Sequence, residues 1–217
     1  MYPFHQLHQF SLNRAILNFN TDEKVLWADL VHFSRELNFP SLQADAGAFI
    51  NWMIPFLGKK LNIFEFGSGF GHSAFWYFAC NKSSSIDQVH LTERREDLRA
   101  YFEKLNWPDQ WKRKMLYHQG DGLVYLQQQS QKFDMALIDG QKSSYQQCLQ
   151  ILSEQMKPAG LVFIDNMFWK GQILEQSVAR STQALIDLHE WLLTQQDFEV
   201  LFLPVADGVS VLRKKAI

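Results

Sequence analysis

The sequence has few cysteines and no strong excess of charge. Cys80 and Cys148 are the only cysteines in 217 residues, too few for a disulfide scaffold, and we expect both to be buried, reduced thiols. Lys and Arg total 21 against 23 Asp and Glu, which gives a formal net charge of -2. This balance creates no field that would attract phosphate backbones or anionic lipid, and so argues against a nucleic-acid partner.

Long hydrophobic runs and zinc-binding patterns are also absent. No stretch reaches the roughly 18 consecutive apolar residues that span a membrane, and residues 1–6 lack the basic and apolar segments of a signal peptide. We therefore predict a cytoplasmic protein with no membrane partner. The seven histidines form neither an HExxH motif nor a Cys/His spacing typical of zinc sites.

Short β-rich runs alternate with amphipathic segments from Asn62 onward, a rhythm typical of a parallel sheet covered by helices on both faces. The predicted strands are 62–67, 86–93, 115–119, 133–139, 160–166, 198–203 and 208–213. The predicted helices include 73–80, 96–106, 143–157 and 175–194.

The two ends of the chain complete the predicted architecture. Only residues 204–207 separate the last two strands, so these strands must pair as an antiparallel hairpin. Residues 11–58 show helical periodicity before the first strand begins. We predict a single α/β domain over residues 1–217, with a helical cap at 1–58 and a core at 59–217 that contains a seven-stranded, mostly parallel sheet.

A glycine-rich loop joins the first predicted strand to the following helix. Its glycines, Gly67, Gly69 and Gly71, are spaced GxGxG, whereas a dinucleotide-binding loop has the spacing GxGxxG. Glycine allows backbone to approach a ligand closely, and the helix N-terminus attracts an anion. The pattern favours S-adenosylmethionine, whose anionic group is a small carboxylate. A tight turn without a ligand is the alternative.

Polar residues at the next two strand ends extend this hypothesis. Glu93 ends the second predicted strand, where its carboxylate could accept hydrogen bonds from both hydroxyls of a ribose. Alternatively, it belongs to a solvated charge cluster over 92–97. After the third strand, Gly120, Asp121 and Gly122 form a small polar turn suited to packing beside an adenine.

The fourth and fifth predicted strands end in oxygen-bearing side chains. Asp139 ends one strand, and Asp165 with Asn166 ends the next, so adjacent parallel strands could bring the three together. Ligation by oxygen alone selects a hard cation, Mg²⁺ before Mn²⁺ or Ca²⁺. The alternative is that both aspartates cap the helices that follow.

Five sequence blocks resemble one known family in the family's own order. Residues 44–50 resemble ADEGQFL, 65–73 resemble ExGxxxGxS, 133–145 resemble FDxxFxDxxKxxY, 165–171 resemble DNxLWxG and 204–208 resemble PxxDG. Over about residues 42–213 the chain is therefore similar to the cation-dependent O-methyltransferases, the family of caffeoyl-CoA and catechol O-methyltransferases.

The resemblance implies a Rossmann-like class I methyltransferase fold, a homodimer and a set of functional residues. The residues that it and the strand-end positions assign to S-adenosylmethionine are Glu65, Gly67, Ser68, Gly69, Ser73, Glu93, Asp121, Gly122 and Asp139. The metal ligands would be Asp139, Asp165 and Asn166, and the catalytic residues would be Lys142, as general base, and Asp139. Metal coordination lowers the pKa of a bound hydroxyl, and a nearby Lys can accept its proton.

The chain also departs from the family pattern. Gln141 replaces an acid, His72 replaces an aromatic residue, and the segment before Ala44 matches poorly. The cap and the loops near 169–172 would shape the acceptor pocket, so the sequence does not name the acceptor. We expect a small aromatic with neighbouring hydroxyls; the alternatives are a hydroxylated uridine of tRNA and a non-catalytic cofactor-binding protein.

Overall fold

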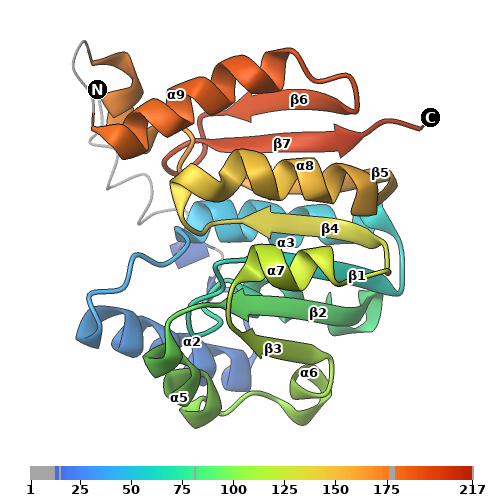
Figure 1. Cartoon of the computed structure of the whole chain (residues 1–217). Coiled ribbons are helices and arrows are strands. Elements are labelled where there is room, and N and C mark those ends of the chain that lie inside the picture. Colours follow the sequence, from blue (N-terminus) through green and yellow to red (C-terminus); the bar gives the residue numbers. More distant parts are fainter. Residues whose placement is uncertain (1–12, 15, 81, 176–178, 217) are drawn as a thin grey trace.

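Seven strands form one sheet with helices on both faces in the computed structural model, which describes residues 13–14, 16–80, 82–175 and 179–216 (Figure 1). The strands are β1 Leu61–Phe66, β2 Ile86–Glu93, β3 Met115–Gln119, β4 Phe133–Ile138, β5 Met156–Ile164, β6 Phe198–Leu203 and β7 Val209–Lys214. The α-helices are α2 Thr21–Glu36, α3 Ala44–Leu57, α4 Ala74–Phe78, α5 Glu96–Lys104, α6 Asp109–Lys112, α7 Gly122–Gln127, α8 Tyr145–Gln155 and α9 Arg180–Leu193. Short 3-10 helices occur at η1 Lys82–Ser85, η2 Lys142–Ser144 and η3 Trp169–Leu174.

The strand order is β3-β2-β1-β4-β5-β7-β6. Strands β1 to β5 run parallel, and β7 is antiparallel to both of its neighbours. This arrangement confirms the predicted mostly parallel sheet with an antiparallel C-terminal hairpin. The order reverses between β1 and β4, and a ligand crevice is expected outside the carboxyl ends of strands at such a switch point.

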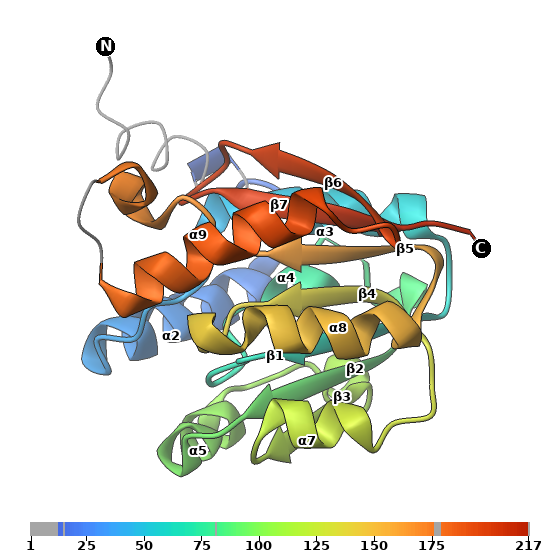
Figure 2. The same cartoon turned by 45° about the horizontal axis from the view of Figure 1, so that its top comes forward.

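Each face of the sheet has its own core. Alternate strand residues point to opposite faces, so Ile63 and Phe163 face α2, α3 and α4, whereas Phe64 and Val162 face α7, α8 and α9. Figure 1 shows α7, α8 and α9 in front of the sheet with α3 behind it, and Figure 2 shows the same layers with the top of the molecule tilted forward. Both faces of the parallel strands are therefore covered.

The N-terminal helices are attached to the sheet by polar as well as apolar contacts. Asn20 and Glu23 form a reciprocal capping box at the start of α2. The buried Glu23 carboxylate also accepts a hydrogen bond, 3.0 Å long, from the backbone nitrogen of Cys80. This contact ties the first turn of α2 to the chain just after α4.

Several predicted boundaries are wrong. The predicted helix 143–157 stops at Gln155 and β5 starts at Met156, not at 160. The reason is local, since Pro158 disfavours helical backbone at the residue before it and Ala159 has a positive φ of 63°. The predicted helices 73–80 and 96–106 are shorter, at Ala74–Phe78 and Glu96–Lys104.

The last predicted helix and one cysteine also need correction. Helix α9 begins at Arg180, whereas Glu175 is extended, and residues 176–178 of the predicted helix 175–194 lie outside the described residues, as do residues 1–12 of the cap. Cys148 is buried as predicted, but Cys80 is half-buried because it leaves α4 with a positive φ of 57°. Both thiols are free.

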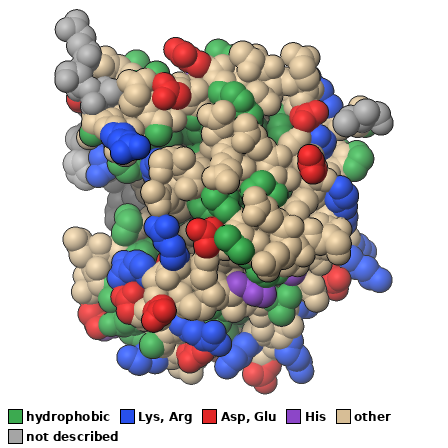
Figure 3. Space-filling model, in the orientation of Figure 1, with side chains coloured by type: hydrophobic (Ala, Val, Ile, Leu, Met, Phe, Trp, Pro, Cys, Tyr) green, Lys and Arg blue, Asp and Glu red, His purple; other side chains and the backbone are tan. Residues whose placement is uncertain are grey.

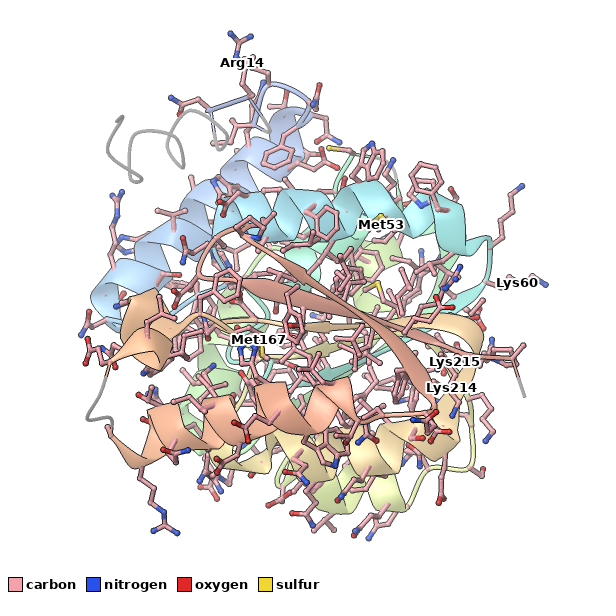
Figure 4. All side chains as sticks on the ribbon, turned by 90° about the horizontal axis from the view of Figure 1, so that it is seen from above. Arg14, Met53, Lys60, Met167, Lys214 and Lys215 are labelled. Atoms are coloured by element: carbon pink, nitrogen blue, oxygen red, sulfur yellow. The ribbon has the colours of Figure 1, made fainter. Side chains whose placement is uncertain are left out.

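The two ends of the sheet differ in the side chains they carry. Figure 4 labels Lys60, Lys214 and Lys215 at one end of the sheet, away from Met167, which follows β5. Because β7 is antiparallel, its carboxyl end lies beside the amino ends of the parallel strands. In the part of the chain that the structure describes, no helix is long and apolar enough to cross a bilayer.

Candidate active site

A cavity of about 430 Å³ lies at the carboxyl ends of the parallel strands. It is lined by Phe39, Pro40, Phe66, Gly67, Thr92, Glu93, Arg94, Arg95, Gly120, Asp121, Gly122, Asp139, Gly140, Gln141, Lys142, Ser144, Asn166 and Trp169. These residues come from the ends of all five parallel strands and from the loop between α2 and α3. In Figure 3, basic, acidic and hydrophobic side chains meet on the left of the molecule, where these strands end.

The glycine-rich loop brings backbone segments into close contact. Gly67 has a φ of 89°, and a Cβ there would lie 2.5 Å from the Cα of Gly140, so the loops after β1 and β4 touch through backbone alone. A Cβ on Gly69 would lie 2.4 Å from the Phe39 ring. Of these predicted cofactor residues, Gly67 lines the cavity, whereas Gly69 packs against the loop before α3.

Three other predicted cofactor residues lie beneath this loop. Glu65 is fully buried and accepts hydrogen bonds from the hydroxyls of Ser73 and Tyr77, the latter 2.8 Å long. Burial raises the pKa of Glu65 to about 7, although both hydroxyls act in the opposite direction. The buried hydroxyl of Ser68 accepts a 3.0 Å hydrogen bond from the Thr92 nitrogen. Glu65, Ser68 and Ser73 therefore support the loop from below the cavity wall.

Glu93 and the turn after β3 do line the cavity. The Glu93 carboxylate accepts hydrogen bonds from the backbone nitrogens of Gly69, at 2.9 Å, and Arg95, at 2.7 Å. It therefore joins the glycine-rich loop to the end of β2. Asp121 caps α7 through the Leu123 nitrogen, 2.8 Å away, and with Gly122 it forms part of the same wall.

Lys142 lies at the centre of a polar cluster beyond β4 and β5. Its ammonium donates to the Asn166 side-chain oxygen, to the Tyr145 hydroxyl at 2.6 Å, and to Asp139 at 3.5 Å. It also lies 5.4 Å from the centre of the Trp169 ring, within the range of a cation–π contact. The structure thus brings together three of the site residues predicted from the sequence, Asp139, Lys142 and Asn166.

Asp165 stands directly behind this cluster and is 2% exposed. One of its carboxylate oxygens accepts a hydrogen bond from the Asn166 amide, 3.2 Å long. The other, Oδ1, has no partner among the residues that the structure describes. Burial raises the pKa of both Asp139 and Asp165, because removal from water disfavours their charged forms. The charge of Asp139 raises the pKa of Asp165 further, whereas Lys142 lowers the pKa of both.

These donors suit a hard divalent cation. Two carboxylates and an amide oxygen are hard ligands, and an unpartnered buried carboxylate oxygen is costly unless something binds it. Asn166 has a φ of 61°, a left-handed conformation that asparagine tolerates, and this bend follows directly on β5. Among the described residues, no three His, Cys, Asp or Glu side chains gather as a metal site, so the predicted set depends on the asparagine.

Sequence reasoning missed several residues of the site. Tyr145 matches the last position of the FDxxFxDxxKxxY block, but its contact with Lys142 was not predicted. Phe39 and Pro40 come from a loop with no pattern that would place them beside the sheet. Arg94 follows Glu93 directly and donates a 2.9 Å hydrogen bond to Gln141.

The two departures from the family pattern have different surroundings. His72 is buried against Trp27, with ring centres 5.0 Å apart, and burial lowers its pKa to about 4, so it acts as a neutral core aromatic. Gln141 is exposed and joins Arg94 to Ser143 through hydrogen bonds of 2.9 Å each. It therefore links the loops after β2 and β4 at the cavity mouth.

Comparison with known proteins identifies the class. The profile of the O-methyltransferase family matches residues 18–215, and the chain belongs to this family of enzymes. Caffeoyl-CoA O-methyltransferase 1 of Eucalyptus globulus is 25% identical, covering 82% of this chain and 76% of that protein. Tapetum-specific methyltransferase 1 of Arabidopsis thaliana is 23% identical, covering 78% of this chain and 76% of its own.

Solved structures share the fold. The O-methyltransferase TomG of Streptomyces achromogenes, involved in tomaymycin synthesis and solved with S-adenosylmethionine, has a TM-score of 0.80 and 16% identity, with all of both chains covered. An O-methyltransferase of Bacillus cereus, solved with S-adenosylhomocysteine, has a TM-score of 0.74 and 18% identity, covering 88% of this chain and 91% of its own. The predicted class of enzyme, an O-methyltransferase, is confirmed by the family match.

Proposed function

We propose that this chain transfers the methyl group of S-adenosylmethionine to a hydroxyl of a small catechol-like aromatic, with the help of a divalent cation. The observation that carries the proposal is the cluster of Asp139, Asp165, Asn166 and Lys142 at one side of the cavity. Its unpartnered Asp165 oxygen fits a cation better than it fits a purely structural role.

The cofactor would occupy the cavity between the ends of β1, β2 and β3. Glu93 would hold the ribose hydroxyls, and Gly67, Asp121 and Gly122 would form the walls beside it. Glu65, Ser68, Gly69 and Ser73 would support the loop that presents those backbone groups. When bound, S-adenosylmethionine supplies an electrophilic methyl group on sulfur. The complexes solved with TomG and the Bacillus cereus enzyme support this assignment.

Asp139, Asp165 and Asn166 would hold the cation, Mg²⁺ in preference to Mn²⁺ or Ca²⁺. When bound, the cation supplies a Lewis acid that lowers the pKa of an acceptor hydroxyl. Lys142, in its neutral form, would receive the hydroxyl proton as general base. Its amine lies beside Asp139 and Asn166, and its side chain is 12% exposed, which supports this role. Holding acceptor and methyl donor in line provides a further large part of the rate enhancement.

The acceptor would enter past Trp169. A second hollow of about 600 Å³ includes Phe168 and Lys170, the sequence neighbours of Trp169, and is lined by Gln43, Phe168, Lys170, Gly171, Ile173, Leu174, Ala206 and Asp207. Its mainly apolar lining fits an aromatic acceptor better than a nucleic acid.

The homodimer and the cytoplasmic location stay predictions. The exposed rings of Trp52 and Phe56 on α3 offer an apolar surface for contact between two copies of the chain. Analytical ultracentrifugation of the chain tests the dimer.

The proposal is tested by transfer of a labelled methyl group. A panel of catechols and their mono-hydroxyl analogues, with unmodified and hydroxylated tRNA, is assayed in Mg²⁺, in Mn²⁺ and in excess chelator. We expect turnover of catechols that chelator abolishes and Mg²⁺ or Mn²⁺ restores. Transfer to hydroxylated tRNA alone would replace the acceptor class, and binding of S-adenosylhomocysteine without any transfer would support a non-catalytic protein.

A further inference from the structure

Lys142 and the proposed cation depend on the same oxygen atoms. In the structure the Lys142 ammonium donates to Asn166 and lies 3.5 Å from Asp139, two of the three proposed cation ligands. A cation bound to those oxygens carries like charge and would take them away from the lysine. The ammonium would then lose two of its three hydrogen-bond acceptors.

The third acceptor belongs to Tyr145, which is not a proposed cation ligand. The Tyr145 hydroxyl accepts a 2.6 Å hydrogen bond from Lys142, and the ammonium lies 4.9 Å from the centre of the same ring. Tyr145 itself is fully buried at the start of α8. Its backbone nitrogen donates to the carbonyl of Lys142, so the two residues are also fixed to each other through the main chain.

We propose that Tyr145 is a positioning residue: its hydroxyl keeps Lys142 beside the position of the methyl acceptor when a divalent cation binds the oxygens of Asp139 and Asn166. This inference rests on the proposed cation site. Without the Tyr145 hydroxyl, a cation that displaced Lys142 from Asp139 and Asn166 would leave its ammonium with no hydrogen-bond acceptor. An unpaired buried charge costs free energy, so the cation would bind more weakly. Tyr145 therefore makes cation binding compatible with a lysine that stays in place.

A double-mutant cycle, with cation affinity as the measured quantity, tests this role of Tyr145. Mn²⁺ binding is measured by calorimetry, without acceptor, on the wild type, Tyr145→Phe, Lys142→Met and the double variant. Lys142→Met removes the competing ammonium and should tighten Mn²⁺ binding by about tenfold. Tyr145→Phe keeps the ring and its packing but should weaken Mn²⁺ binding by about tenfold when Lys142 is present. In the Lys142→Met background the same change should alter affinity by less than about twofold.

A matched control separates this role from a general effect on folding. Tyr77 is a second fully buried tyrosine whose hydroxyl bonds to a carboxylate, Glu65, and Tyr77→Phe should leave Mn²⁺ affinity unchanged. Thermal unfolding of each variant is recorded in the same buffer. Two results would overturn the positioning role but leave the cation site in place. One is an equal loss of Mn²⁺ affinity on Tyr145→Phe with and without Lys142, and the other is weaker Mn²⁺ binding by Lys142→Met than by the wild type. A wild type that binds no Mn²⁺ would overturn the cation site and this inference together.

Discussion

Two buried carboxyl groups at the carboxyl end of the sheet have opposite surroundings. Glu65, the next-to-last residue of β1, is fully buried, and each of its oxygens accepts a hydrogen bond from a neutral hydroxyl. Asp165, just after β5, is 2% exposed, yet one of its oxygens has no partner among the described residues. Both groups have a raised pKa because burial disfavours their charged form.

The difference separates a structural role from a binding role. A buried polar group with all its partners inside the protein contributes to the stability of one local structure. A buried polar group that lacks a partner costs free energy in the folded chain unless a ligand provides the partner. On this comparison Glu65 fixes the glycine-rich loop, whereas the unpartnered oxygen of Asp165 agrees with the cation-binding role proposed for it.

The strongest effect is predicted for the replacement of Asp165, the carboxyl group with an unpartnered oxygen. Asp165→Ala removes one of the two charged side chains proposed to hold the cation, so cation-dependent transfer should fall by roughly 10³-fold or more, the equivalent of several kcal/mol of transition-state stabilisation. The affinity for S-adenosylhomocysteine should change little, because the residues proposed to hold the cofactor lie at the ends of β1, β2 and β3. Steady-state transfer assays and calorimetry measure the two quantities.

Asp134→Ala is a suitable control for that change. Asp134 is also an acid of the central sheet, but its carboxylate is paired with Lys157 at 2.8 Å, away from the cavity. The control should keep most of its transfer activity. Equal activity of Asp165→Ala and the wild type would contradict the assignment of Asp165 to the cation.

A second prediction concerns Glu65 and the pH dependence of the free energy of unfolding. The pKa of Glu65 is raised from 4.5 to about 7 in the folded state, so the folded chain holds this proton more tightly than the unfolded chain. The resulting stability is complete below pH 4.5 and is lost as the pH rises towards 7. Glu65→Gln cannot titrate, so the stability of the wild type relative to this variant should fall by up to about 3 kcal/mol across that interval.

Urea unfolding of both chains at several pH values measures this difference and cancels the contribution of other groups. His72 and other buried groups titrate equally in the two proteins, so they drop out of the subtraction. A difference that stays constant from pH 4.5 to 7 would show that Glu65 keeps an ordinary pKa.

The weakest effect is predicted for Glu93, whose carboxylate has partners in the protein, as Glu65 has, but also lines the cavity. Its oxygens accept from the Gly69 and Arg95 nitrogens, yet it also lines the cavity. Glu93→Ala should weaken binding of S-adenosylhomocysteine by about tenfold or more, because charge-assisted hydrogen bonds to the ribose are lost. Calorimetry on Glu93→Ala and Glu93→Gln measures the change, and an unchanged affinity would remove Glu93 from the cofactor site.

Much of the fold could be predicted because the strands are apolar, regular and separated by clear turns. Strands β2, β3 and β6 have the predicted bounds, and the short connection at 204–207 correctly required a hairpin. Helices α6 and α7 were not predicted because Asp109–Lys112 and Gly122–Gln127 are too short to show helical periodicity. The start of β5 was missed because Met156 and Lys157 continue the apolar and polar pattern of α8 into extended backbone.

The site could be predicted where it follows directly from strand ends. Asp139 and Asn166 line the cavity because the carboxyl ends of β4 and β5 are adjacent, and Asp165 stands behind them. The depth of each side chain was not predictable, since Glu65 and Ser73 lie beneath the loop that the motif describes. Contacts such as that between Tyr145 and Lys142 depend on how η2 turns into α8, and no spacing rule specifies that turn.

The left-handed bend at Asn166 has a consequence for protein engineering. The chain takes positive φ values at Asn166, Trp169, Lys170 and Gly171, and Asn166 and Trp169 line the cavity. One residue thus both shapes the backbone and presents an oxygen to the cluster. Transferring only the side chains of Asp139, Asp165 and Asn166 to another protein scaffold would therefore not reproduce the site. The smallest transplantable unit is the whole exit of β5, residues 164–171, together with the lysine-bearing turn beside it.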